Sequence, residues 1–226
     1  MSESTDNVET ELLPEDYNKY DISFKMIVIG DAGVGKSCLT SKASKGVFEE
    51  SYAPTVGFEF LVFNVKINGK VIKLQIWDTC GQELYRSLIS SFYRNSTLAM
   101  MVYAIDNKES FNHINAWLKE VKLQSNPDIK LFLIGNKTDL EEKRQVSTEE
   151  AKTFKEENGF HYFNETSAKT GFNAKEVFIE AAKLLYSDFL QYKGKHKKIE
   201  TSQDEVPIPL KAPQKQDIRK KKGCCG

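Results

Sequence analysis

The chain has 226 residues, a length that suits one domain with short tails. Its 32 Lys and Arg residues balance 32 Asp and Glu residues, and this zero net charge argues against a globally basic nucleic-acid-binding protein. No run of about 18 apolar residues occurs, so we expect no transmembrane helix. The four cysteines stand at positions 38, 80, 224 and 225, which predicts no disulfide framework and fits a reducing cytosol.

The beginning of the chain is acidic, and a phosphate-binding pattern follows it. Residues 1–21 carry seven acids and one lysine, which predicts a disordered arm, with a short docking segment as the alternative. Residues 24–29 are apolar and β-prone, which predicts a buried strand. Residues 30–37 then read Gly-Asp-Ala-Gly-Val-Gly-Lys-Ser, the pattern G-x-x-x-x-G-K-[ST] of a phosphate-binding loop. Residues 36–45 lack Pro and Gly and can form the helix that this loop requires.

The residue types of this loop match the chemistry of phosphate binding. Gly30, Gly33 and Gly35 allow the backbone to turn tightly and to bring its N–H groups to phosphate oxygens. The helix N-terminus adds partial positive charge. We expect Lys36 to reach the β- and γ-phosphates and the Ser37 hydroxyl to bind Mg²⁺. The alternative is a glycine-rich turn with an accidental Lys-Ser pair, and the strand before the loop argues against it.

A loop over residues 46–55 leads to a predicted hairpin. Its strands cover about residues 58–67 and 71–77, and Asn68-Gly69 between them is a strong turn signal because both residues tolerate positive φ. We expect this antiparallel pair to form the edge of an otherwise parallel sheet. The second strand leads into Asp78, and a carboxylate at the C-terminal end of a strand points to the crevice where α/β sheets bind ligands.

Strands and helices alternate over the rest of the chain. Further strands are predicted at residues 98–105, 130–134 and 160–164. Further helices are predicted at residues 84–94, 108–125, 147–158 and 173–192. The alternation predicts an α/β domain over residues 22–192, with a mostly parallel six-stranded sheet, one antiparallel edge strand and helices on both faces. Residues 193–226 are rich in Lys, Gln, Pro and Ser, which predicts a flexible tail.

The chain resembles the Ras superfamily of small GTPases, and within it the Rab branch. Five guanine-nucleotide motifs stand in the family's order: residues 30–37, Thr55, Asp-Thr-Cys-Gly-Gln at 78–82, Asn-Lys-Thr-Asp at 136–139 and Thr-Ser-Ala-Lys at 166–169. The Rab resemblance rests on residues 56–60, 73–79 and 84–94 and on a double cysteine near the end. The resemblance covers about residues 21–191 and the last residues, and it implies the P-loop G-domain fold.

The resemblance implies a site for GTP or GDP with Mg²⁺. Ser37 and Thr55 would supply hydroxyls to Mg²⁺, and Asp78 would hold it through a water. Gln82 would orient the attacking water while Lys36 neutralises charge in the transition state, which makes these two the candidate catalytic residues. The other nucleotide-binding candidates are Ala32, Gly33, Val34, Gly35, Cys38, Phe48, Gly81, Asn136, Lys137, Asp139, Ser167, Ala168 and Lys169.

Asn136 and Asp139 are the best candidates for reading guanine. A carboxylate can accept from the base N1–H and N2–H₂ groups together, and leaving it unpaired is costly, so the site should reject ATP. Taken alone, this stretch could be a charged turn after a strand. The resemblance places Lys137 over the base plane, the Ala168 N–H at the guanine oxygen and Phe48 at the base edge, with ordinary loop packing as the alternative for Phe48.

Phe60, Trp77 and Phe92 occupy positions where Rab proteins present an aromatic surface to effectors, with simple core packing as the alternative. Cys80 departs from the family, which mostly has alanine beside the γ-phosphate. It leads to an alternative function, a GTP-binding scaffold with little intrinsic hydrolysis, whereas the retained Gln82 favours slow hydrolysis. A P-loop ATPase or kinase is a third possibility that the guanine-reading motif disfavours.

The end of the chain reads Arg-Lys-Lys-Lys-Gly-Cys-Cys-Gly over residues 219–226. Cys224 and Cys225 resemble the Rab double-geranylgeranylation site, with reactive thiols in a disordered basic tail as the alternative. Two lipid chains anchor a protein stably, and basic residues add attraction to an anionic leaflet. The resemblance therefore implies a switch that recruits effectors in vesicle trafficking, at the cytosolic face of an intracellular membrane and cycling with the cytosol. It implies an exchange factor, a GTPase-activating protein and an escort protein or GDP-dissociation inhibitor as partners, and we expect a monomer that binds no nucleic acid.

Overall fold

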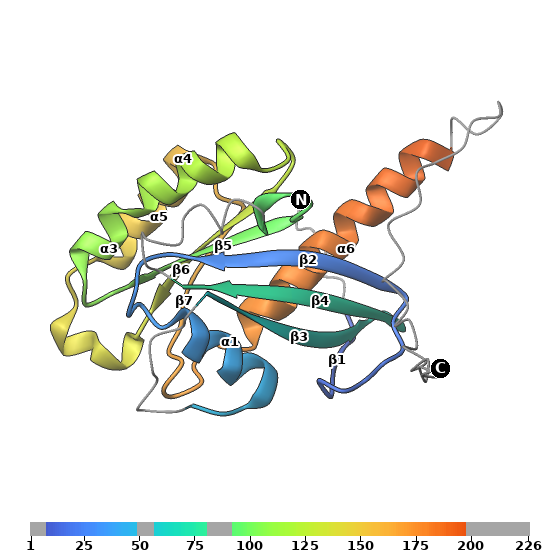
Figure 1. Cartoon of the computed structure of the whole chain (residues 1–226), viewed down its shortest axis with the longest axis horizontal. Coiled ribbons are helices and arrows are strands. Elements are labelled where there is room, and N and C mark those ends of the chain that lie inside the picture. Colours follow the sequence, from blue (N-terminus) through green and yellow to red (C-terminus); the bar gives the residue numbers. More distant parts are fainter. Residues whose placement is uncertain (1–7, 49–56, 81–91, 198–226) are drawn as a thin grey trace, which may run out of the picture. The chain divides into compact units, whose positions relative to one another are not determined.

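A computed structural model describes residues 8–48, 57–80 and 92–197, without the side chains of residues 194–197 (Figure 1). The chain divides into a compact unit over residues 1–190 and a second unit over residues 191–226. Of the second unit, the described part is the helical continuation over residues 191–197. The helix predicted at residues 84–94 lies almost entirely outside the described residues.

The first unit is built on one mixed sheet. Its strands are β1 (Thr10–Leu13), β2 (Ile22–Ile29), β3 (Phe58–Ile67), β4 (Lys70–Thr79), β5 (Leu98–Ala104), β6 (Lys130–Asn136) and β7 (Tyr162–Glu165). They lie in the order β1-β3-β4-β2-β5-β6-β7. The pairs among β4, β2, β5, β6 and β7 are parallel, whereas β3 runs antiparallel to both of its neighbours. The predicted α/β class is confirmed, but the sheet has seven strands rather than six.

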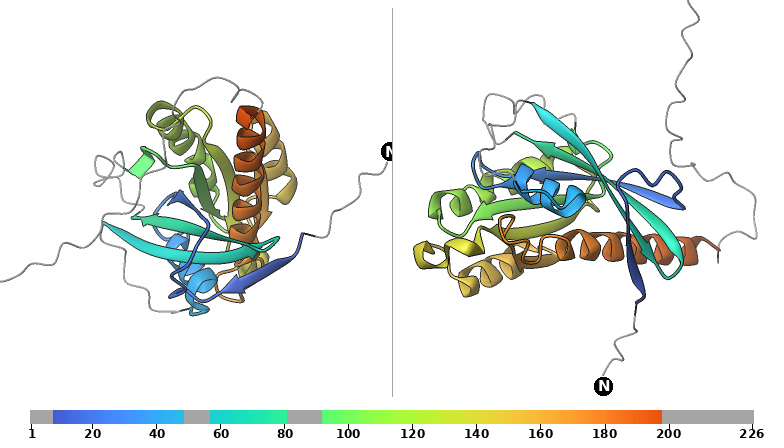
Figure 2. Two further views of the ribbon diagram at one scale, coloured as in Figure 1. Left: turned by 90° about the vertical axis from the view of Figure 1, so that its right-hand side faces the viewer. Right: turned by 90° about the horizontal axis from the view of Figure 1, so that it is seen from below.

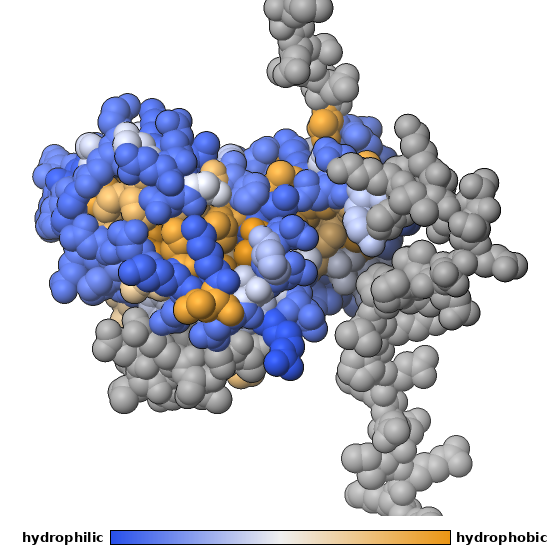
Figure 3. All heavy atoms as spheres, turned by 90° about the horizontal axis from the view of Figure 1, so that it is seen from above, coloured by the Kyte–Doolittle hydropathy of each residue, from blue (hydrophilic) through white to orange (hydrophobic). Residues whose placement is uncertain are grey.

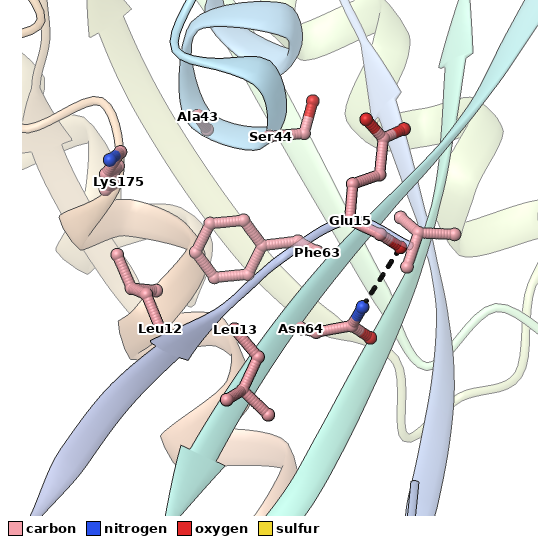
Figure 4. Close-up of a pocket in the computed structure, with 9 residues that line it drawn as sticks. Leu12, Leu13, Glu15, Ala43, Ser44, Phe63, Asn64 and Lys175 are labelled. Carbon is pink, nitrogen blue, oxygen red and sulfur yellow. Dashed lines mark hydrogen bonds between the residues drawn. The ribbon is translucent and has the colours of Figure 1, made fainter. Parts of the chain in front are cut away.

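The additional strand is β1, which lies within the stretch predicted to be disordered. It pairs with β3, with Leu13 opposite Asn64, so β3 is not the edge strand that the sequence predicted. The turn after β1 is held by the Asn64 side chain, whose Nδ2 donates to the Pro14 carbonyl oxygen at 2.9 Å. It also donates to the Glu15 carbonyl oxygen at 3.2 Å (Figure 4). The disorder prediction is therefore wrong for residues 10–13. An acidic composition does not reveal a ladder whose partner strand lies far along the chain.

A small cavity of about 70 Å³ lies beside this arm (Figure 4). It is lined by Leu12 and Phe63, and by Ala43 and Ser44 from the last turn of α1 (Lys36–Lys45). The phosphate-binding loop precedes the first turn of this helix, so the cavity and the loop belong to opposite ends of α1.

The predicted hairpin between β3 and β4 is confirmed. Asn68 and Gly69 both adopt positive φ, 47° and 77°, which matches the two-residue turns that connect twisted antiparallel strands. The turn sets the register that places Phe60 opposite Trp77 and Glu59 opposite Asp78.

Helices cover both faces of the sheet (Figure 2). They are α1, α3 (Lys108–Asn112), α4 (Ile114–Gln124), α5 (Thr148–Asn158) and α6 (Glu176–Lys197), with a 3₁₀ helix at Thr138–Lys143. One core cluster joins the sheet to α1 and α6, and a second joins its other face to α3, α4 and α5. The central strand β5 is buried at all seven positions, as expected for a parallel strand covered on both sides.

Two helix boundaries differ from the prediction. The single helix expected over residues 108–125 is divided at His113 into α3 and α4. The last helix continues to Lys197 instead of ending at residue 192. The boundaries of α5 are confirmed, because the Ser147 hydroxyl accepts from the Glu150 N–H at 3.1 Å and Gly159 adopts the left-handed conformation that ends the helix.

The face seen from above is largely hydrophilic, with hydrophobic residues gathered in patches between polar ones (Figure 3). Among the described helices, none combines the length and the apolar character that a membrane crossing would need.

Candidate functional site

The polar residues predicted from the motifs follow the carboxyl ends of parallel strands. Residues 30–37 follow β2, residues 136–139 begin at the end of β6, residues 166–169 follow β7, and Asp78 lies near the end of β4. Because these strands are parallel, their carboxyl ends meet at one edge of the sheet, where α/β proteins bind ligands.

The loop after β2 needs its glycines. Gly30 has a φ of 139°, and a Cβ atom there would lie 2.1 Å from the Val102 carbonyl oxygen of β5. Gly35 has a φ of 91°, and a Cβ atom there would lie 2.5 Å from Asn136 Nδ2. Both positions combine a left-handed backbone with a close neighbour, so a side chain at either would displace the loop.

Lys36 lies inside this loop. Its side chain is buried, and its Nζ donates to the carbonyl oxygens of Gly30 and Asp31, both at 2.8 Å. Burial lowers the pKa of Lys36, and the nearby carboxylates of Asp78 and Asp31 oppose that shift. A buried ammonium surrounded by backbone dipoles is well placed to meet an anion.

Ser37 and Asp78 form a pair of oxygen donors beside Lys36. The Ser37 hydroxyl donates to Asp78 Oδ2, and the Asp78 side chain is fully buried. Burial raises the pKa of Asp78 to about 6, against the opposing effects of the Ser37 hydrogen bond and of Lys36. Within the described part of the chain, Asp78 Oδ1 has no hydrogen-bond partner. A buried carboxylate oxygen that lacks a partner, next to a hydroxyl, fits the oxygen ligands that Mg²⁺ prefers.

Asn136 connects the phosphate-binding loop to the loop after β7. Its Nδ2 donates to the Val34 carbonyl oxygen at 2.9 Å, while its Oδ1 accepts from Thr166 Oγ1 at 3.1 Å and from the Ala168 N–H at 3.2 Å. The side chain is almost completely buried. The sequence suggested guanine reading for this residue, and the structure adds the task of fixing two loops to each other.

Asp139 lies at the exposed end of this loop pair. Its Oδ1 accepts a hydrogen bond of 2.6 Å from the buried Ser167 hydroxyl. The Thr138 N–H donates to the Thr166 carbonyl oxygen at 3.0 Å, and Lys137 adopts a left-handed φ of 72°. The two loops that the resemblance assigns to the base are therefore neighbours, although residues 136–139 and 166–169 are far apart in the chain.

The other predicted site residues make fewer contacts with the loops described above. Ala32, Gly33 and Lys169 are exposed, and Cys38 lies half-buried in the first turn of α1. Phe48 packs against the core cluster on the α1 and α6 side, as in its alternative interpretation. The remaining predicted site residues lie outside the described residues; they are Thr55, Gly81, Gln82, Cys224 and Cys225.

The three predicted effector residues form one aromatic cluster. The ring centroids of Phe60 and Trp77 lie 5.2 Å apart, and those of Trp77 and Phe92 lie 5.0 Å apart. The sequence missed Phe58, whose ring lies 4.6 Å from that of Phe92; it shares a strand face with Phe60, two residues away, which was the available signal. Phe58 and Phe60 are about half exposed, 50% and 47%, whereas Trp77 and Phe92 pack against the core.

The sequence also missed three residues around the start of the phosphate-binding loop. Asp31 Oδ1 accepts from Trp117 Nε1 at 2.9 Å, and Asp31 Oδ2 lies 2.6 Å from His113 Nδ1. Trp117 belongs to α4, and His113 separates α3 from α4. No local pattern signals these contacts, because they join residues more than 80 positions apart.

Three features define a P-loop nucleotide-binding protein of the small GTPase class. They are a glycine-containing loop around a buried lysine, a Ser–Asp pair of oxygen donors, and two adjoining loops at the same edge of the sheet. The model of the Ras family matches residues 25–187, well over half of the chain. The chain belongs to the Ras family of small GTPases. Members of this family bind GTP or GDP with Mg²⁺ and act as switches through exchange factors, GTPase-activating proteins and effectors.

Proposed function

We propose that this small GTPase is of the Rab type. It binds Mg·GTP, hydrolyses it slowly and, in its GTP state, recruits effectors to the cytosolic face of an intracellular membrane in vesicle trafficking. The observation that carries this proposal is the aromatic cluster of Phe58, Phe60, Trp77 and Phe92 beside the nucleotide site.

The end of β4 joins the two sites. Successive residues of a strand point to opposite faces, so Trp77 lies in the aromatic cluster on the α3–α5 side while Asp78 meets Ser37 on the other. A change in the ligands that Asp78 contacts would therefore shift the position of Trp77, its neighbour in the strand. Two of the four rings, those of Phe58 and Phe60, are about half exposed, which suits a surface that partners bind.

For the nucleotide, we assign the N–H groups of residues 32–38 and the Lys36 ammonium to the phosphates. Ser37 and Asp78 would hold Mg²⁺ together with Thr55, and a bound Mg²⁺ would neutralise phosphate charge. Gln82 is assigned to orienting the attacking water.

For the base, we assign the Asp139 carboxylate to the N1–H and N2–H₂ donors of guanine, with Lys137 along the base plane. The Ala168 N–H, which donates to Asn136 Oδ1 at 3.2 Å, would be shared with the guanine oxygen. The Ser167 hydroxyl supports this assignment, because its hydrogen bond orients the carboxylate. Asn136 holds the loop that carries Asp139 against the phosphate-binding loop.

The membrane part of the proposal rests on the sequence of the tail. Geranylgeranyl groups on Cys224 and Cys225 would anchor the protein, and the basic residues 219–222 would strengthen the contact with anionic lipid. An escort protein or GDP-dissociation inhibitor would then be needed to move a doubly lipidated protein through the cytosol.

A GTP-binding scaffold with little hydrolysis is a second candidate, and the burial of Cys80 favours it. Cys80 is 2% exposed and directly precedes the segment that carries Gln82. A larger residue than alanine in such a closed position can resist rearrangement of that segment. If Cys80→Ala raises single-turnover hydrolysis manyfold from near zero, the scaffold is the better description.

The first experiment is to denature the purified protein and identify the released nucleotide by chromatography. The protein is then loaded with GTP and Mg²⁺, and conversion to GDP is followed. Guanine nucleotide with slow conversion supports the switch, and guanine nucleotide without conversion supports the scaffold. Adenine nucleotide, or none after loading, would refute both.

Membrane anchoring is tested by imaging the tagged protein beside a variant in which Cys224 and Cys225 are replaced by serine. We expect membrane-bound signal for the first and diffuse signal for the second. Diffuse signal from both would contradict the anchoring proposal without touching the nucleotide site.

A further inference from the structure

We infer that His113 and Trp117 are positioning residues for the phosphate-binding loop: through the Asp31 carboxylate they fix the carbonyl group that holds the Lys36 ammonium. The inference rests on the nucleotide site proposed above. It adds His113 and Trp117, which lie outside all five guanine-nucleotide motifs, to Asp31 and Lys36, which lie inside the first.

The Asp31 carboxylate is held at both oxygens. Trp117 Nε1 donates to Oδ1 at 2.9 Å, and His113 Nδ1 lies 2.6 Å from Oδ2. The Trp117 side chain is 2% exposed, so this hydrogen bond is sheltered from water. The ring of Trp117 is also part of the core cluster that contains Ile27 and Ile29 of β2, the strand that leads into the loop.

The backbone of Asp31 carries this restraint to Lys36. The Asp31 carbonyl oxygen accepts from Lys36 Nζ at 2.8 Å, at the same distance as the Gly30 carbonyl oxygen. A side chain fixed at two points limits the torsions of its own residue, and therefore the direction of its carbonyl group. The ammonium that would meet the phosphates is thus connected through one residue to the junction of α3 and α4.

His113 lies where α3 meets α4, and its helical backbone, with a φ of −69° and an N–H bonded to the Glu109 carbonyl oxygen at 3.0 Å, holds its side chain in place. That side chain contacts the Asp31 carboxylate. Of the other described charged groups, Glu109 Oε1 lies 4.0 Å from His113 Nε2 and is largely exposed. That carboxylate is too distant and too solvated to replace the contact with Asp31.

The loop is consequently fixed at both ends. Asn136 holds its last part through the Val34 carbonyl oxygen, and the Trp117–His113 pair holds its first part through Asp31. A loop that must present several N–H groups to a diphosphate at once binds more tightly when it is preorganised. Loosening the first end should therefore speed the release of GDP.

The test measures the dissociation rate of fluorescent GDP from the full chain, chased with excess unlabelled GDP in Mg²⁺. Trp117→Phe keeps the ring but removes the N–H donor, and we expect about tenfold faster release, equivalent to about 1.4 kcal/mol. For His113→Ala, at an exposed position, we expect about threefold faster release. Asn115→Ala on the exposed side of α4 and Glu109→Gln are the matched controls and should release GDP at the wild-type rate.

A double-mutant comparison distinguishes positioning from general loosening of the helix. If both residues act through Asp31, then Asp31→Ala with Trp117→Phe releases GDP no faster than Asp31→Ala alone. The inference would be overturned if the effects of Asp31→Ala and Trp117→Phe on the release rate multiplied in the double variant. It would also be overturned if Trp117→Phe and His113→Ala both released GDP at the wild-type rate. His113 is solvent-exposed, so its variant remains informative even if Trp117→Phe fails to fold. A wild-type chain that binds no GDP would instead overturn the nucleotide site itself, and the inference with it.

Discussion

Replacing Asn136 by alanine provides the strongest test of how the loops of the nucleotide site depend on one another. The side chain makes hydrogen bonds of 2.9, 3.1 and 3.2 Å to Val34, Thr166 and Ala168 in a buried position. Alanine removes all three and leaves their partners without a replacement. At about 1 kcal/mol of net stabilisation for each bond, the loss is about 3 kcal/mol.

Most of this loss should appear in nucleotide affinity, because the bonds join two loops that must contact the same ligand. A loss of about 3 kcal/mol corresponds to about 100-fold weaker GDP binding, measured by titration of fluorescent GDP into nucleotide-free protein. Asn64→Ala is the matched control, since Asn64 is also buried and bonds backbone carbonyl oxygens, but at the N-terminal arm. It should lower the free energy of unfolding and leave GDP affinity unchanged.

The opposite outcome is that Asn136→Ala binds GDP within about threefold of wild type while its free energy of unfolding falls as in Asn64→Ala. That result would mean that the hydrogen bonds of Asn136 stabilise the fold and that the nucleotide organises the loops without them.

Three further predictions concern single positions. Gly35→Ala should abolish GDP binding in the same titration, because its Cβ would lie 2.5 Å from Asn136 Nδ2 at a φ of 91°; binding within tenfold of wild type would contradict this. Asp139→Asn should weaken GTP binding and favour XTP, whose 2-carbonyl accepts where guanine donates, and competition between the two nucleotides measures the change; an unaltered preference would show that Asp139 does not read the base. His161 Nδ1 accepts from the Leu131 N–H at 3.1 Å, and burial holds the pKa of His161 below its ordinary value near 6.5. The unfolded chain therefore takes up the proton first, so stability should fall as pH drops below about 6.5. Thermal melts should show a flatter pH profile for His161→Gln than for the wild type, and coincident profiles would contradict this.

Features that depend on neighbours in the chain were predictable from the sequence. The phosphate-binding loop, the Asn68-Gly69 hairpin and the Ser147 cap each consist of a few consecutive residues whose backbone preferences suffice. The alternation of strands and helices then restricted the fold to a mostly parallel sheet, since few topologies satisfy it.

Features that depend on distant partners were not predictable. The strand β1 exists because β3 offers an unpaired edge, and nothing in the acidic segment itself indicates that partner. The contacts of Asp31 with His113 and Trp117 likewise arise only after β2 and α4 pack together. The sequence found the residues that resemble motifs, whereas the residues that hold them in place became visible only in three dimensions.

The strand β1 also has a practical consequence for handling the protein. The family match begins at residue 25, and a chain shortened to that boundary would lose β1 and the turn that follows it. The backbone groups of β3 from Asn64 to Ile67 would lose their partners, and the buried Asn64 amide would lose its acceptors. Unpaired strand edges are templates for pairing between molecules. We expect the shortened chain to aggregate at concentrations where the full chain remains monodisperse, so a domain boundary chosen by family similarity alone would yield a less soluble protein.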